Sequence, residues 1–225
     1  MNYEKIRTSQ PGPGISEDEW NDEFDGCDCE NECSAEKKCS CLMGGSDNYS
    51  NDFKLLPKEG TLLVECSDKC SCSWFEKTCR NRLLQNGIKK SLKIFETSVK
   101  GHGVKAGEPI RAGEFVCEYA GEVLGEEEVE RRCEEFKERD NYTLTLKEHF
   151  GVDNTLKTFI DPRLRGNIGR FLNHSCDPNC EVVIVRLGRM IPTAGIFAKR
   201  DIQSGEELCY DYGSSAIKEG EERKL

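Results

Sequence analysis

The residues best suited to chemistry are nine cysteines in the first third of the chain. They follow the order C-x-C-x3-C-x5-C-x-C, a 24-residue gap, and then C-x3-C-x-C-x6-C. An odd number of thiols cannot all pair as disulfides, and nine thiols do not divide into separate four-thiolate sites. Three tetrahedral zinc ions need twelve sulfur contacts, which six terminal and three bridging thiolates supply. The sequence therefore predicts one three-zinc cluster, with the ligands Cys27, Cys29, Cys33, Cys39, Cys41, Cys66, Cys70, Cys72 and Cys79.

A disulfide-stapled secreted module is the alternative interpretation of these cysteines. It requires an oxidising compartment, and the N-terminal run MNYEKIRTSQPGPG contains no apolar core of a signal peptide. The metal interpretation is therefore favoured. Of the five later cysteines, Cys117, Cys133, Cys180 and Cys209 are expected to be small buried hydrophobic residues. Cys176 belongs to a separate polar stretch.

Four short stretches after the cysteines carry groups that could act on a ligand. The Gly-His-Gly turn at 101–103 permits close approach of the backbone. The run Asn-His-Ser-Cys at 173–176 contains no separated base and nucleophile and no G-x-S-x-G elbow. Tyr210 and Tyr212 are two apart, so both can face one side of a strand. The fourth stretch is the turn at 119–122. Taken singly, each of the four also has an ordinary structural explanation.

The elements that must position these groups are mainly strands. Residues 20–82 show little periodicity, so this segment is expected to fold only with metal. Short strand-like runs follow, for example at 92–95 and 114–119, with a hairpin formed by 182–187 and 191–198. One helix is predicted over 125–139, with Val129, Cys133 and Phe136 on one face. The fold class is mostly β (α+β), with one principal domain and a metal-built appendage.

Composition limits the possible partners. The formal charge of −10 and the pI near 5.0 argue against tight binding to phosphate backbones, and no sequence-specific nucleic-acid binding is expected. An acidic surface suits a basic partner better. No stretch approaches the ~20 apolar residues of a membrane span, so no membrane partner is expected. Residues 1–20 are predicted to be a flexible lead-in and 215–225 a charged tail.

In their order along the chain, the nine cysteines and the four short stretches after them resemble the suppressor-of-variegation class of SET-domain protein lysine methyltransferases. The resemblance runs from Cys27 to Gly213, and its most specific part is RLRGNIGRFLNHSCDPN at 163–179. The run EYAGEVLG at 118–125 is similar to that of members fused to a transposase. The resemblance implies a pre-SET module over 21–82 and a SET domain over 83–214. In that fold short β-sheets surround a knot-like crossing of the Asn-His-Ser-Cys segment and the terminal Tyr-x-Tyr strand.

The family also implies roles for individual residues. S-adenosylmethionine would be held by Gly101, His102, Gly103, Tyr142, Arg170, Asn173 and His174. Tyr142, Tyr210 and Tyr212 would line the lysine channel, and Tyr210 would limit the product to mono- or dimethyl-lysine. The implied activity is methylation of a histone H3 tail, at its ninth residue, on chromatin in the nucleus and on the chromosome. The zinc cluster would then be structural.

Two departures from the family pattern stand out. His102 replaces the tryptophan often found in the Gly-x-Gly turn, and no cysteine follows Cys209, so Cys176 lacks the three partners expected around a fourth zinc. The second departure supports another interpretation, a catalytically weak, zinc-stapled chromatin adaptor that binds a basic tail. Retention of Tyr142, Asn173, His174 and Tyr212 favours the enzyme. Binding of S-adenosylmethionine would discriminate between the two.

Overall fold

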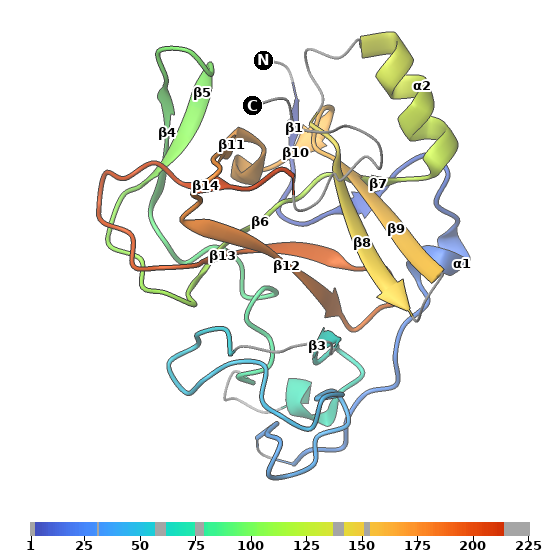
Figure 1. Cartoon of the computed structure of the whole chain (residues 1–225). Coiled ribbons are helices and arrows are strands. Elements are labelled where there is room, and N and C mark those ends of the chain that lie inside the picture. Colours follow the sequence, from blue (N-terminus) through green and yellow to red (C-terminus); the bar gives the residue numbers. More distant parts are fainter. Residues whose placement is uncertain are drawn as a thin grey trace.

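The protein is built around two four-stranded sheets (Figure 1). This computed structural model describes residues 3–30, 32–56, 62–74, 79–136, 142–150 and 154–213. The predicted charged tail at 215–225 lies outside the described residues. The predicted fold class, mostly β with few helices, is confirmed.

The first sheet has the order β3-β12-β13-β6. The long antiparallel pair β12 (Cys180–Leu187) and β13 (Thr193–Ala198) confirms the predicted hairpin. Its turn includes Gly188 at φ +75°, a conformation that favours glycine. β6 (Phe115–Glu118) pairs antiparallel with β13, and β3 (Leu63–Glu65) pairs parallel with β12. Through β3, the cysteine-rich segment is part of the main sheet.

The second sheet has the order β2-β7-β9-β8. β7 (Glu122–Leu124) lies between β2 (Gln10–Pro11) and β9 (Asn154–Asp161), and β8 (Leu144–Phe150) forms the far edge. Only the second half of β9 is buried, because its first half extends with β8 beyond the core. Val123, Leu144, Leu146 and Ile160 from this sheet join residues of the first sheet in one hydrophobic core. This core fixes the ends of the strands that carry the site.

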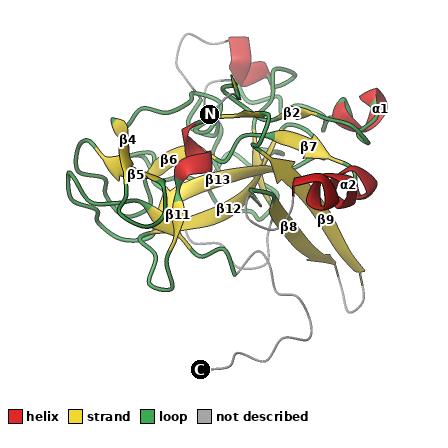
Figure 2. Ribbon diagram, turned by 90° about the horizontal axis from the view of Figure 1, so that it is seen from above, coloured by secondary structure: helices red, strands yellow, loops and turns green. Residues whose placement is uncertain are grey.

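Smaller elements surround these sheets (Figure 2). The two-stranded sheets are β1 (Glu4–Lys5) with β10 (Arg165–Gly166), β4 (Leu92–Glu96) with β5 (His102–Ala106), and β11 (Asn173–His174) with β14 (Cys209–Tyr210). The helices are α1 (Glu17–Trp20), α2 (Glu126–Phe136) and the 3₁₀ turns η1 (Ser71–Trp74) and η3 (Ile168–Phe171). Ser16 and Glu19 form a capping box that begins α1.

The prediction of a flexible lead-in is wrong for residues 3–20. β1 pairs parallel with β10, β2 pairs parallel with β7, and Ile6 and Ser9 are buried. Strand edges present unpaired backbone groups, and this segment satisfies them despite its proline, glycine and serine content. The local composition therefore gave the wrong expectation because the partners lie more than 100 residues away.

The helix was predicted in the right place, but its buried residue differs. α2 covers Glu126–Phe136, and residues 137–141 lie outside the described part. Cys133, expected to be buried, is exposed, whereas Arg132 is 3% exposed. The Arg132 side chain pairs with Glu122 and Asp161, both at 2.9 Å, and with Glu128 at 2.7 Å. The helix is thus fixed by a buried ion cluster.

Of the other cysteines expected to be buried, Cys117 and Cys180 are buried, and Cys209 is partly exposed.

Candidate functional site

Two segments that are distant in sequence meet at the centre of the candidate site. β11 pairs parallel with β14, with Asn173 opposite Cys209 and His174 opposite Tyr210 (Figure 1). The Ser175 amide extends this contact by donating to the Tyr210 carbonyl at 3.1 Å. The Asn-His-Ser-Cys run and the Tyr-x-Tyr run therefore lie side by side.

His174 connects these two segments through its ring. The Tyr212 backbone N–H donates to His174 Nδ1 at 3.1 Å, which places the ring proton on Nε2. Nε2 lies 3.3 Å from Cys176 Sγ. The Tyr212 ring lies 5.3 Å from the imidazole, centroid to centroid. His174 thus orders the turn that carries Tyr212.

The Gly-His-Gly turn lies against Asn173. The Asn173 Nδ2 donates to the His102 carbonyl at 3.2 Å. Gly101 has φ +70°, and a methyl group at Gly103 would lie 3.1 Å from Asn173 Nδ2. Both glycines are therefore needed, the first for its backbone conformation and the second for space. The backbone here is left open to a ligand.

Arg170 is a buried cation without an ionic partner in the described residues. It is 7% exposed, and its guanidinium stacks on the rings of Tyr3 at 4.2 Å, Tyr142 at 4.8 Å and Phe171 at 5.3 Å. Its Nε and Nη1, like the Nδ1 of His102, are buried and have no hydrogen-bond partner in the part of the chain that the structure describes. Orphaned buried donors are costly, so these atoms fit a polar or anionic ligand. A carboxylate is one acceptor that fits the two guanidinium nitrogens.

Phenol rings form the other side of the site. The Tyr210 ring lies 4.7 Å from the Tyr212 ring and 6.0 Å from the Tyr119 ring. The Tyr212 hydroxyl donates to the Leu172 carbonyl at 2.6 Å, and the Tyr119 hydroxyl donates to the Tyr142 carbonyl at 2.6 Å. These contacts bring all three predicted tyrosines to one place.

The phenols are neutral at neutral pH, as an ordinary phenol is. Burial raises the pKa values of Tyr119 and Tyr210 well above the ordinary value, and partial burial raises the pKa of the half-exposed Tyr212 to about 12. At neutral pH the hydroxyls can donate and accept hydrogen bonds but cannot act as anionic bases. Their oxygen atoms can therefore orient an amine without removing its proton.

Tyr119 was not among the predicted site residues. It was considered only as the start of a turn after a strand, yet it packs against Tyr210 and holds the backbone of Tyr142. Tyr119 directly follows β6, in a turn that contains the close-packed Gly121. A methyl group at Gly121 would lie 2.6 Å from the Asp161 carbonyl carbon, so this turn is tightly constrained.

The nine cysteines form a separate, compact cluster at the opposite end of the molecule (Figure 1). All are free, and all are buried except Cys29, which is partly exposed. Sulfur separations such as 3.6 Å for Cys27–Cys33 and 3.5 Å for Cys41–Cys70 are far longer than a disulfide bond. Three sets of four cysteines have their sulfurs within 4.8 Å of one another, and Cys66 belongs to all three sets. This sharing suits metal ions bridged by thiolates.

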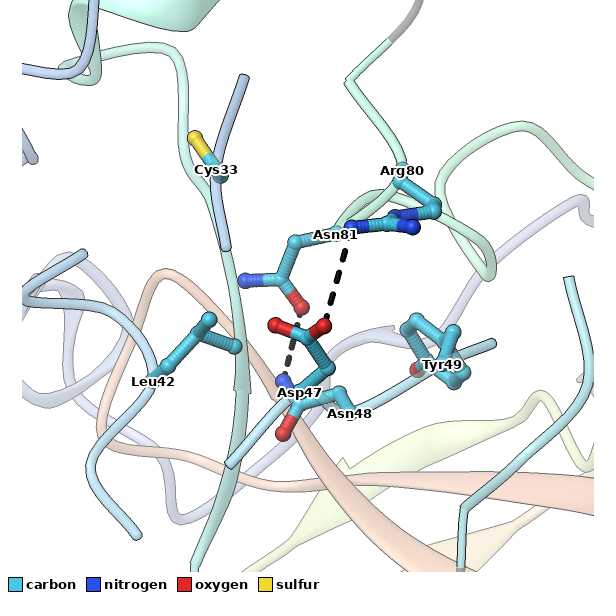
Figure 3. A pocket seen from close by; sticks show the side chains of 7 residues that line it. All are labelled: Cys33, Leu42, Asp47, Asn48, Tyr49, Arg80 and Asn81. Carbon is cyan, nitrogen blue, oxygen red and sulfur yellow. Dashed lines mark hydrogen bonds and ion pairs between the residues drawn. The ribbon is translucent and has the colours of Figure 1, made fainter. Parts of the chain in front are cut away.

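Polar side chains close the cluster on the side of Cys33 (Figure 3). Asn48 Nδ2 donates to Asn81 Oδ1 at 2.7 Å, and Arg80 lies 3.6 Å from Asp47. The Asn81 amide also donates to Cys66 Sγ at 3.4 Å. Hydrogen bonds to sulfur orient a thiolate ligand and offset its charge.

Known proteins match the whole chain. A SET domain model matches residues 101–213, and a Pre-SET motif model matches residues 2–82. The Caenorhabditis elegans protein named "Probable histone-lysine N-methyltransferase set-23" is 66% identical over 100% of this chain and 92% of that protein. The described part of this chain contains no helix that could cross a membrane.

Two solved structures extend this similarity. The methyltransferase domain of human histone-lysine N-methyltransferase SETMAR has a TM-score of 0.85 and 40% identity, over 94% of this chain and 76% of that one. KRYPTONITE, in complex with DNA, an H3(1-15) peptide and S-adenosylhomocysteine (SAH), has a TM-score of 0.75 and 29% identity, over 99% of this chain and 44% of that one. The resemblance predicted from the motifs is confirmed.

Proposed function

Because the chain belongs to the SET-domain family of histone-lysine N-methyltransferases, we propose that it transfers methyl groups from S-adenosylmethionine to the tail of histone H3. The observation that carries this proposal is the contact of Tyr212 with both halves of the site. Its ring lies 5.3 Å from His174, on the side of the methyl donor, and 4.7 Å from Tyr210, on the side of the lysine. A donor and an acceptor bound on the two sides would meet beside this phenol.

The methyl donor would be held by the backbone of Gly101–Gly103, by Asn173 and His174, and by Arg170. The Arg170 guanidinium is stacked on Tyr142, and its Nε and Nη1 have no hydrogen-bond partner among the described residues. S-adenosylmethionine supplies an electrophilic methyl group on a sulfonium. A neutral lysine amine takes this methyl group in an in-line displacement, which depends on alignment and exclusion of water. No charged base is required beside the amine.

The lysine side chain would lie among Tyr119, Tyr142, Tyr210 and Tyr212. Since the pKa values of Tyr210 and Tyr212 lie above the ordinary phenol value, these two side chains offer no anionic base, and the ammonium would lose its proton to water before transfer. Tyr210 is 4% exposed, and its hydroxyl would occupy space beside the bound amine. We infer that the product is mono- or dimethyl-lysine. The methylated position would be the ninth residue of H3, which would place the protein on chromatin in the nucleus.

The cysteine cluster would hold three zinc ions as a structural unit. Thiolates in overlapping sets of four, almost wholly buried, fit closed tetrahedral zinc sites. The cysteine-rich segment lies at the opposite end of the molecule from β11 and β14 (Figure 1), so zinc would take no part in methyl transfer.

The test combines binding with product analysis. Calorimetry should show S-adenosylmethionine binding to the purified chain, and mass spectrometry should show methyl groups on an H3 tail peptide but not on the same peptide with arginine at position nine. His174→Ala serves as the binding-deficient comparison, because it removes the acceptor of the Tyr212 amide. Cofactor binding without any methylated product would favour a peptide-binding adaptor. Absence of cofactor binding would refute the proposal.

A further inference from the structure

Glu207 contacts the proposed methyl-donor site without having been assigned to it. Its Oε1 accepts a hydrogen bond from Asn173 Nδ2 at 2.8 Å. The same nitrogen donates to the His102 carbonyl at 3.2 Å. An amide has two N–H hydrogens, so these two acceptors account for both. The orientation of the Asn173 amide is therefore determined, and of its two polar side-chain atoms Oδ1 is the one that these hydrogen bonds leave available to a ligand.

We propose that Glu207 is a positioning residue that presents Asn173 Oδ1 to the methyl donor. If the amide rotated by half a turn, Oδ1 would face the Glu207 carboxylate and the His102 carbonyl. The bond to Glu207 is charge-assisted and so is stronger than the longer bond to His102. Glu207 thus contributes most of the preference for one orientation. This inference rests on the proposed function.

The packing around Asn173 and Glu207 supports this positioning role. A methyl group at Gly103 would lie 2.9 Å from Glu207 Oε1 and 3.1 Å from Asn173 Nδ2, so the hydrogen-bonded pair occupies the space that a side chain would need. A backbone bridge between Lys105 and Glu207 holds Glu207 beside β5. The adjacent Glu206 has different partners, Arg200 at 2.6 Å and Asn179 at 2.9 Å. Glu207 alone of these two faces the site.

Calorimetry on three variants tests the proposal. Glu207→Ala should weaken binding of S-adenosylmethionine and SAH about equally, by roughly tenfold, because both ligands carry the same hydrogen-bond donors. Glu207→Gln retains a carbonyl acceptor for Asn173 and should stay within about threefold of wild type. Glu181→Ala removes an exposed carboxylate from β12 and should bind both ligands like wild type. The melting temperature of each protein is measured without ligand, and KM for the methyl donor should rise in Glu207→Ala while kcat stays near wild type.

The outcomes separate this inference from the proposed function. Wild-type binding by Glu207→Ala would overturn the positioning role alone. Weaker binding of S-adenosylmethionine but not of SAH would assign Glu207 to attraction of the sulfonium charge. Equal losses in Glu207→Gln and Glu207→Ala would show that the carboxylate charge, and not the acceptor for Asn173, supports binding, and would overturn the positioning role. If Glu207→Ala did not fold while Glu207→Gln behaved like wild type, the role of Glu207 would be to stabilise the fold. A wild-type protein that binds neither ligand would overturn the proposed function and this inference together.

Discussion

The Tyr212 hydroxyl has a fixed direction because it donates its hydrogen to the Leu172 carbonyl at 2.6 Å. Its oxygen lone pairs are then free to orient the substrate amine and the transferred methyl group. Tyr212→Phe should leave the dissociation constant of S-adenosylmethionine nearly unchanged and lower kcat at least tenfold, because the phenol acts only on the aligned reactants. Calorimetry and a histone-peptide assay measure the two effects. Full activity in this variant would refute the assignment of Tyr212 to the channel.

The pH dependence follows from the neutral phenols. The Tyr212 phenol, with its pKa raised to about 12, stays protonated as the lysine substrate loses its proton. The rate at saturating S-adenosylmethionine should therefore increase with pH up to about 10, near the ordinary pKa of lysine. The stability that comes from keeping Tyr212 neutral should be lost only as pH rises from about 10 through 12. A rate that already falls as the pH is raised toward 9, in protein that circular dichroism shows to be folded, would contradict this account.

We expect the space around Tyr210 to limit the number of methyl groups that the lysine receives. This side chain is 4% exposed, between the rings of Tyr119 and Tyr212. Tyr210→Phe removes the hydroxyl and the hydrogen bond of ~1 kcal/mol that it would make to the lysine amine, so higher methylation states should increase several-fold. Mass spectrometry after exhaustive reaction measures the ratio. Abundant trimethyl-lysine from the wild-type protein would show that Tyr210 does not limit the product.

Most of these side chains could be predicted because short motifs encode them. Asn173, His174, Tyr210 and Tyr212 lie in two runs whose spacing is visible in the sequence, and the structure brings those runs together. Glu207 and Tyr119 could not be identified in the same way. Their roles depend on partners 34 and 23 residues away, and no local pattern specifies such contacts.

A buried arginine anchors α2 to the second sheet. Arg132 pairs with three carboxylates, including Asp161 of β9, which is 0% exposed. Removing one partner of a buried ion pair leaves charge uncompensated, so Arg132→Met should lower the free energy of unfolding by about 3 kcal/mol. Denaturant unfolding measures this loss. The neighbouring Arg131, which forms exposed pairs with Glu128 and Glu135, provides the control, and Arg131→Met should cost less than about 1 kcal/mol.

Hydrophobic spacing identified this helix but not its buried face. A pattern of Val129, Cys133 and Phe136 suggested an apolar contact, whereas the structure buries an arginine against acids on β7 and β9. The N-terminal strands show the same limit, since Glu4 pairs with Arg165 and Gln10 with Glu122. Strand periodicity and turn residues predicted β4, β6, β12 and β13 well, because those signals are local.

The cysteine module and the SET domain share one hydrophobic cluster. Tyr49 and Leu63 pack with Phe115, Val185 and Phe197. The fully buried Glu65 of β3 accepts hydrogen bonds from the Tyr49 hydroxyl and the Leu84 amide, both at 2.8 Å. Losing the order of the module would expose this cluster and remove β3 from the edge of the main sheet. The molecule is therefore expected to unfold as one unit.

Metal removal tests this coupling. Elemental analysis of the purified protein should give about three zinc ions per chain, as bridging thiolates require. A strong chelator should then lower the melting temperature and abolish S-adenosylmethionine binding over the same range of zinc occupancy, because metal binding supplies the folding energy of the module. Restoring zinc should restore both properties.

A pair of cysteine variants separates metal loss from general thiol effects. Cys66 is 0% exposed and belongs to all three possible metal sets, whereas Cys133 is exposed on α2. Cys66→Ser should reduce the zinc content and cofactor binding together, because a bridging ligand serves more than one ion. Cys133→Ser should retain about three zinc ions and wild-type affinity. A Cys66→Ser protein that lost zinc but bound S-adenosylmethionine normally would show that the site holds its shape without the module.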